Sequence, residues 1–223
     1  MRLLTSFLVL ILPLAAQSDT VKRLDAATET LSEIMGAPDK GIPQDLLDKA
    51  ECVVVVPGVL KGGFIIAAKY GRGFAVCRNV DGKGWGAPSG VRIEGGSFGF
   101  QIGGSQTDVV MLMMNRKGME RLTSNKFTVG GDASVAAGPV GRESTAQTDA
   151  TMRAEILSWS RSRGVFAGVA LNGATLRPDE SSNDEMYGPG KQPKDILLGS
   201  VPPPTSAQKL LSLLNKYSSR HSG

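Results

Sequence analysis

Apolar residues recur at every third or fourth position near the beginning of the chain, which is the spacing of one face of a helix. Within residues 18–35 this face consists of Val21, Leu24, Thr28, Leu31 and Met35. Ser18 or Asp19 can cap the first turn of this helix, and Gly36 can end it. Pro43 then opens a short second helix that ends near Ala50, because proline suits the first helical position. Two helices are therefore expected ahead of the main body of the fold.

From Cys52 onward the pattern changes to short apolar or alternating runs, which are typical of strands. The predicted strands cover residues 53–56, 64–70, 74–78, 91–94, 98–102, 109–114, 127–129, 134–137, 152–159 and 165–171. Gly71-Arg72-Gly73 lies between the second and third runs and predicts a hairpin turn. Residues 109–114 are apolar on both faces, which indicates a central strand. One short helix is expected over residues 116–123.

Glycine pairs punctuate these strands, at residues 62–63, 95–96, 103–104 and 130–131. Glycine inside a strand marks a bulge, a bend or a close approach of backbones. So many of them in one sheet indicate strong curvature. We therefore predict a single α+β domain, in which a curved, mostly antiparallel β-sheet is covered by the N-terminal helices and one middle helix.

The chain turns polar after Leu176. The acidic run there is either a solvated surface turn or a calcium loop, but Asp184 and Gly190 stand where such a loop has Gly and Glu. Residues 202–204 form a stiff proline spacer, and residues 205–208 read Thr-Ser-Ala-Gln, which fits a capping box. An apolar stripe follows, made of Leu210, Leu211, Leu213, Leu214 and Tyr217. It predicts a C-terminal helix.

The first sixteen residues have the order of a secretory signal peptide: Arg2, an apolar run over residues 3–14, then Ala15 and Ala16. We expect cleavage after Ala16 and export to the periplasm or the outside of the cell; the alternatives are an uncleaved anchor and a buried helix. Export places Cys52 and Cys77 in an oxidising compartment. A disulfide between them and two buried free thiols both fit the sequence.

Composition argues against the commoner catalytic sites. The only histidine of the 223 residues is His221, and two cysteines cannot form a structural zinc site alone. Gly82-Lys83 and Gly190-Lys191 are followed by Gly and Gln, so neither forms a phosphate-binding loop. The net charge of +4 is spread without long basic runs, so no nucleic acid partner is expected. We expect no enzyme activity, cofactor or metal.

The helix over residues 18–35 allows two interpretations. Its polar side carries Lys22 and Arg23 but also three acidic residues, so it can pack on its own sheet or lie on a membrane surface. Further basic residues fall at predicted strand ends or turns and could form a basic rim: Lys61, Lys69, Arg72, Arg78, Arg161 and Arg163. Each would contribute about 1 kcal/mol near an anionic bilayer.

Five motifs occur in order along the chain. They are Pro-Gly-x-x-Lys-Gly-Gly-Phe at residues 57–64, Trp-x-x-Pro at 85–88, Gly-x-Gln-Ile-Gly-Gly at 99–104, Gly-Gly-Asp-Ala-Ser at 130–134 and Ser-Arg-Gly-x-Phe-Ala-Gly at 162–168. With them the chain resembles the SYLF domain family over about residues 43–188. The resemblance implies a lipid-binding module without catalysis. Eukaryotic members bind phosphoinositides and, in fungi, actin filaments; bacterial members are exported.

The resemblance and the pattern together give an expected organisation. Residues 1–16 are a signal peptide, 17–42 an amphipathic helix, 43–200 the SYLF domain, and 201–223 a proline-rich spacer with a C-terminal helix. The expected partner is an anionic phospholipid or membrane surface, and the alternative is an envelope protein that docks through the C-terminal helix. The expected lipid-binding residues are Val21, Lys22, Arg23, Leu24, Leu31, Met35, Lys61, Lys69, Arg72, Arg161 and Arg163.

Overall fold

The computed structural model describes residues 18–36, 41–62, 66–79, 81–98, 105–140, 153–162, 165–168, 171, 173–199 and 201–218. Outside these residues lie the predicted signal peptide, residues 99–102 of the strand expected at 98–102, and Arg163. Within them, no helix is long and apolar enough to cross a membrane.

One sheet of nine strands organises the described part of the chain, in the order β5-β9-β3-β2-β1-β4-β7-β6, with β8 paired to β7. The strands are β1 (Cys52–Gly62), β2 (Ile66–Cys77), β3 (Ser89–Phe98), β4 (Ser105–Met113), β5 (Phe127–Thr128), β6 (Val135–Ala137), β7 (Ile156–Ser162), β8 (Val165–Gly168) and β9 (Thr175–Pro178). All pairs are antiparallel except β6 with β7. The predicted α+β class is confirmed, and β4 is the central strand that its apolar run indicated.

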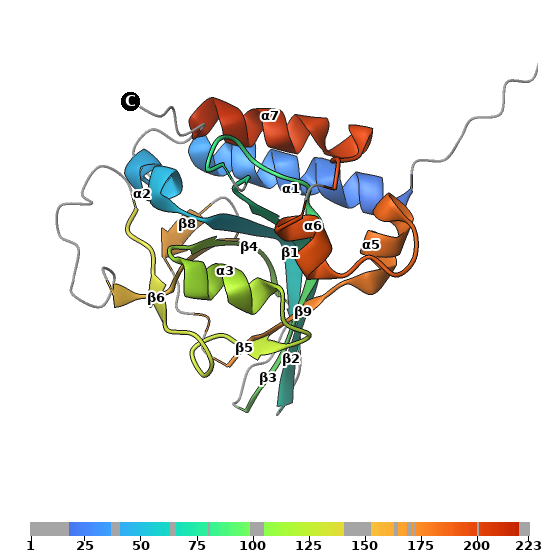
Figure 1. The fold of residues 1–223 in the computed structure, drawn as a ribbon. Coiled ribbons are helices and arrows are strands. Elements are labelled where there is room, and N and C mark those ends of the chain that lie inside the picture. Colours follow the sequence, from blue (N-terminus) through green and yellow to red (C-terminus); the bar gives the residue numbers. More distant parts are fainter. Residues whose placement is uncertain are drawn as a thin grey trace, which may run out of the picture.

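Helices cover both faces of the sheet, and two cores result. The helices are α1 (Asp19–Met35), α2 (Gln44–Lys49), α3 (Arg116–Leu122), α5 (Glu180–Tyr187), α6 (Pro193–Leu197), η1 (Thr205–Ala207) and α7 (Gln208–Tyr217). The helices α1 and α7 lie side by side on one face (Figure 1), where they share a core with Val53, Phe74 and Trp159. On the other face, Leu122 of α3 and Leu197 of α6 belong to the second core.

The hairpin turn expected at residues 71–73 is wrong, because β2 runs through these residues without a break. A Cβ atom on Gly73 would lie 2.0 Å from the carbonyl oxygen of Val55, and one on Gly71 would lie 2.8 Å from a methyl group of Val59. These glycines therefore allow β1 to approach β2 closely, at the point where β1 bulges. The bulge falls at residues 57–58, where the register shifts and Gly58 has φ +60°.

The polar stretch after Leu176 is not a surface turn. Leu176 is buried in β9, and two further helices, α5 and α6, follow. Asn183 of α5 accepts a hydrogen bond from the backbone of Gly90 at 2.7 Å, so polar contacts rather than an apolar stripe hold this helix on β3. The expected capping box at Thr205 is also absent, because the segment starts as a 3-10 turn without a side-chain cap.

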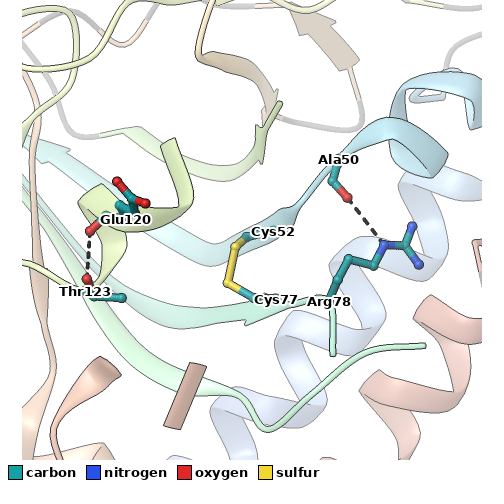
Figure 2. The surroundings of a disulfide bond; sticks show 6 residues. All are labelled: Ala50, Cys52, Cys77, Arg78, Glu120 and Thr123. Atoms are coloured by element: carbon teal, nitrogen blue, oxygen red, sulfur yellow. Dashed lines mark hydrogen bonds between the residues drawn. A yellow bond between two sulfur atoms is a disulfide. The ribbon is translucent and has the colours of Figure 1, made fainter. Parts of the chain in front are cut away.

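A disulfide joins Cys52 of β1 to Cys77 of β2, which are directly opposite in the sheet (Figure 2). Both residues are fully buried, with α3 on one side of the bond. The next residue, Arg78, is buried as well and donates hydrogen bonds to the carbonyl oxygens of Ala50 (3.3 Å) and Ser218 (2.7 Å). Arg78 therefore anchors the end of α7 and is not part of a basic rim.

Candidate binding site

The apolar face of α1 packs on the sheet. Leu24 and Leu31 are fully buried in the first core, and Met35 is half-buried against the same core. Ser18 caps the helix as expected, by accepting a hydrogen bond from the backbone of Val21. The interpretation of Leu24 and Leu31 as side chains that enter a bilayer is therefore wrong for the folded protein, since the sheet and α7 already cover them.

The apolar stripe of α7 is covered in the same way. Leu210, Leu211 and Leu214 are buried in the first core, and Leu213 and Tyr217 pack partly against it. This stripe is not a free face on which another chain could dock, which removes the structural basis of the alternative that the C-terminal helix binds a partner.

A groove of about 610 Å³ runs between the polar side of α1 and the sheet. Four of the expected cations line it: Lys22 and Arg23 from α1, Arg72 from β2 and Arg161 from β7. Lys61 and Lys69 do not line it. They are cross-strand partners that alternate with Leu60 and Tyr70, which line the groove, so they lie on the opposite face of the strands. The structure therefore divides the predicted basic residues into two groups.

Arg72 is held by a carboxylate that sequence reasoning missed. Its Nε and Nη2 atoms donate hydrogen bonds to the two carboxylate oxygens of Asp179, at 2.6 and 2.7 Å. Burial alone would raise the pKa of Asp179, but hydrogen bonds from Arg72, Ser182 and Ser181 outweigh it and lower that pKa below the ordinary value. The hydrogen bond to Asp179 in turn raises the pKa of Arg72 despite burial.

Arg23 lies beside this pair. Its Nη1 atom donates a hydrogen bond of 3.0 Å to Ser182 and lies 4.0 Å from a carboxylate oxygen of Asp179. Burial and the neighbouring charge of Arg72 lower the pKa of Arg23 from its ordinary value. Two guanidinium groups thus share one buried carboxylate at this end of the groove.

Arg161 closes the other end of the groove. It forms an ion pair with Asp108 of β4, from Nη2 at 2.6 Å, and another with Glu33 of α1. Asp108 also accepts a hydrogen bond of 2.8 Å from the backbone N–H of Gly58 in the β1 bulge. Arg161 therefore ties α1 to the sheet, and its charge is shared by two carboxylates.

Large apolar side chains are exposed at one end of the sheet. Among the described residues they are Leu60 (58% exposed), Tyr70 (48%) and Val165 (70%). Leu60 of β1 and Tyr70 of β2 are cross-strand partners, and Gln106 of β4 pairs with Leu60 from the other side. Val165 lies at the same end of the sheet, because it pairs with Ser162 of β7. The hydroxyl of Ser162 donates a hydrogen bond to the carbonyl oxygen of Gln106. We call this region, with the neighbouring Lys61 and Lys69, the exposed strand end.

Among the described residues, no group of three or more His, Cys, Asp or Glu side chains could hold a metal ion. Of the residues that sequence reasoning missed, Asp179 gave a weak signal as the last residue before a helix. Leu60 and Tyr70 gave none, because an exposed apolar residue in a strand has the same pattern as a buried one.

A curved sheet with helices on both faces, a charged groove and an exposed apolar end together define a domain of the α+β class. Residues 94–217 match the model of the Ysc84 family, described as Las17-binding protein actin regulator. The match covers more than half of the chain, so the chain belongs to this family, and the resemblance to SYLF domains is confirmed.

Relatives from animals and yeast extend the similarity. The chain is 35% identical to SH3 domain-containing YSC84-like protein 1 of Rattus norvegicus and 34% identical to that of Homo sapiens, each over 82% of this chain and 54% of the relative. It is 32% identical to LAS seventeen-binding protein 3 of Saccharomyces cerevisiae, over 91% of this chain and 45% of the relative. The chain thus spans about half the length of the curated relatives it matches.

Proposed function

We propose that this protein is a non-catalytic binding module that attaches to anionic membrane surfaces through the exposed strand end. One observation carries the proposal: the three large apolar side chains that the described residues expose lie at one end of the sheet, together with two lysines. Such clustering marks an interaction site, whereas single exposed apolar residues are ordinary. Within the described residues Lys61 and Lys69 have no ion-pair partner, so their charges are available to lipid headgroups.

The chemistry of the exposed strand end suits shallow attachment. Leu60, Tyr70 and Val165 would enter the headgroup region, and a tyrosine suits that boundary because its ring is apolar and its hydroxyl polar. Lys61 and Lys69 would each contribute about 1 kcal/mol near an anionic surface, and less as salt rises. This arrangement assigns lipid contact to strands and leaves the buried face of α1 in the core.

Cosedimentation with liposomes tests the proposal. Phosphatidylcholine vesicles with and without 30% phosphatidylserine, a composition of about one anionic lipid in three, are compared at low and high salt. We expect binding to the anionic vesicles only, weakening with salt. Lys61→Glu with Lys69→Glu abolishes it, whereas Lys191→Glu with Lys194→Glu, the same charge change at exposed sites around α6, leaves it intact. Equal loss of vesicle binding in the two double variants, or no binding of the wild type to anionic vesicles at low salt, refutes the proposal.

A protein partner is the second candidate, and the names of the relatives favour it. The family description names Las17 binding and actin regulation, and the yeast relative is named for Las17 binding. For this chain a pull-down with purified actin filaments distinguishes the two. Cosedimentation with filaments but not with anionic vesicles would replace the membrane proposal by this one.

We also propose that the protein is exported, with cleavage after Ala16. Two features support export: the order of basic, apolar and small residues over residues 1–16, and a disulfide between buried cysteines, since disulfides persist in oxidising compartments. N-terminal sequencing of the protein from a native host tests this. A mature chain that begins at Gln17 is expected, and an intact Met1 in a cytoplasmic fraction would refute it.

A further inference from the structure

The groove beside α1 has ends of opposite charge. At one end Lys22 and Arg23 of α1 face Arg72 of β2, behind which Asp179 is the buried counter-charge. At the other end the acidic side chains Glu29 and Glu33 of α1 face Asp108 of β4, and Arg161 is shared by the last two. Among the described side chains that line the groove, one end therefore has three cations, and the other has three carboxylates and one arginine.

The separation of the two ends follows from two independent features of the fold. Along α1, ten residues separate Arg23 from Glu33, which corresponds to about 15 Å at 1.5 Å per residue. Across the sheet, Arg72 lies on β2 and Asp108 on β4, two strand spacings apart in the order β2-β1-β4, which is about 10 Å. The groove therefore holds its opposite charges about 10–15 Å apart.

Between these ends, the described side chains that line the groove are mostly uncharged. Ala26 and Thr30 of α1 form one wall, and Pro57, Gly58 and Leu60 around the β1 bulge form the other. An extended chain covers about 3.3 Å per residue, so about three to five residues span the distance between the charged ends. A uniformly anionic surface matches only one end, because Glu29, Glu33 and Asp108 repel it at the other.

From this match we propose that the groove binds an extended peptide segment of a partner protein, about three to five residues long between its charges. An acidic side chain or carboxylate of the segment meets Arg23 and Arg72, and a basic side chain meets Glu29 and Glu33. The segment between them is small or apolar and lies against Ala26 and Leu60. The groove shares Leu60 and Tyr70 with the proposed membrane contact, but the lysines of that contact lie on the opposite face of the strands.

Within the described residues Glu29 has no ion-pair partner, and Lys22 pairs only with the exposed Asp19, so both are open to charge changes that leave the fold intact. The probes are three fluorescein-labelled peptides of identical composition. Two carry segregated charges in opposite chain directions, Lys-Lys-Val-Thr-Val-Glu-Glu and Glu-Glu-Val-Thr-Val-Lys-Lys. The third mixes the charges, as Lys-Glu-Val-Thr-Val-Lys-Glu. Binding to the full chain is measured by fluorescence anisotropy.

We expect one of the segregated peptides to bind about tenfold more tightly than the mixed one, because its charges match both ends of the groove. The double substitution Lys22→Glu with Glu29→Lys keeps the net charge and should shift the preference toward the segregated peptide of opposite direction. The single substitution Glu29→Gln should weaken binding of the preferred peptide about twofold to threefold. This variant replaces the double variant in the test if the double variant does not fold.

Equal binding of all three peptides, or an unchanged preference in the double variant with wild-type circular dichroism, overturns the proposal. Absence of vesicle binding with selective peptide binding refutes the membrane proposal alone. The two proposals therefore fail separately.

Discussion

The pair formed by Arg72 and Asp179 is the most informative place to perturb the fold, because it joins the sheet to the segment before α5. We consider the substitution Asp179→Asn, which keeps the shape of the side chain and removes its charge. The Asp179 side chain is only 4% exposed, whereas that of Arg72 is 29% exposed. The substitution leaves Arg72 with a neutral acceptor and places it beside Arg23 without their common counter-charge.

Removing one partner of a buried ion pair typically costs 3–5 kcal/mol, because the other charge stays uncompensated. Arg72 keeps part of its hydration, so we expect the lower end, about 3 kcal/mol in the free energy of unfolding. For a chain of this size that lowers the melting temperature by roughly 6–12 °C. The Nη1 atom of Arg23 lies 4.0 Å from a carboxylate oxygen of Asp179. Arg23 therefore also loses a neighbouring negative charge, which adds to the loss of stability.

The effect should depend on pH in a defined direction. The pKa of Asp179 is lowered in the folded protein, so its carboxylate stabilises the fold above the ordinary value of 3.8. That contribution is lost as the pH falls through the lowered pKa of the folded state. The difference between wild type and Asp179→Asn should therefore be constant between pH 5 and 7, roughly, and shrink below about pH 3.8.

Urea unfolding, followed by circular dichroism, measures these differences. The control is Glu120→Gln, which breaks the exposed pair with Arg116 and should change the free energy of unfolding by less than about 0.5 kcal/mol. A loss of less than 1 kcal/mol, roughly, for Asp179→Asn, or a loss that does not shrink as the pH falls below about 3.8, would show that the pair does not stabilise the fold as argued.

Three further predictions concern the sheet and its cores. Gly73→Ala places a methyl group 2.0 Å from the Val55 carbonyl oxygen and should cost about 3 kcal/mol or more in thermal unfolding, whereas Gly62→Ala meets no atom within 4 Å and should be nearly neutral. Leu31→Ala should cost about 2–5 kcal/mol by urea titration, and Leu60→Ala less than about 0.5 kcal/mol; similar costs would contradict the assigned burial. Replacing both cysteines by Ala opens a loop with a separation of 25 residues and should cost about 3.5 kcal/mol by the chain-entropy relation, measured against wild type with and without reductant.

The elements with a clear period were predictable from the sequence. The helix α1 and the strand β4 follow from apolar spacing alone, because their burial is one-sided in α1 and two-sided in β4. The break expected at residues 71–73 failed because the same glycine pattern serves a turn and a close contact between strands. Whether these glycines form a turn or a close contact depends on the neighbouring strand β1. Its bulge at Gly58 lies thirteen positions before Gly71 in the sequence.

Burial against distant segments was not predictable. The apolar faces of α1 and α7 each fit a membrane or a partner as well as a core, and in the fold they meet one another and the sheet. Asp179 looked like a solvated acid because its neighbours in sequence are polar, whereas its partner Arg72 is 107 residues away. The exposed strand end emerged only from the pairing of strands, which brings Leu60 beside Tyr70.

The anchoring of Ser218 by Arg78 and Trp85 has a practical consequence. These side chains lie next to Cys77, while Leu60 lies eight residues along β1 from Cys52, about 25 Å away. A linker or affinity handle placed after residue 218 therefore leaves the molecule far from Leu60 and Tyr70. Protein captured on a sensor by such a handle should present that end outward in a uniform orientation, without further engineering.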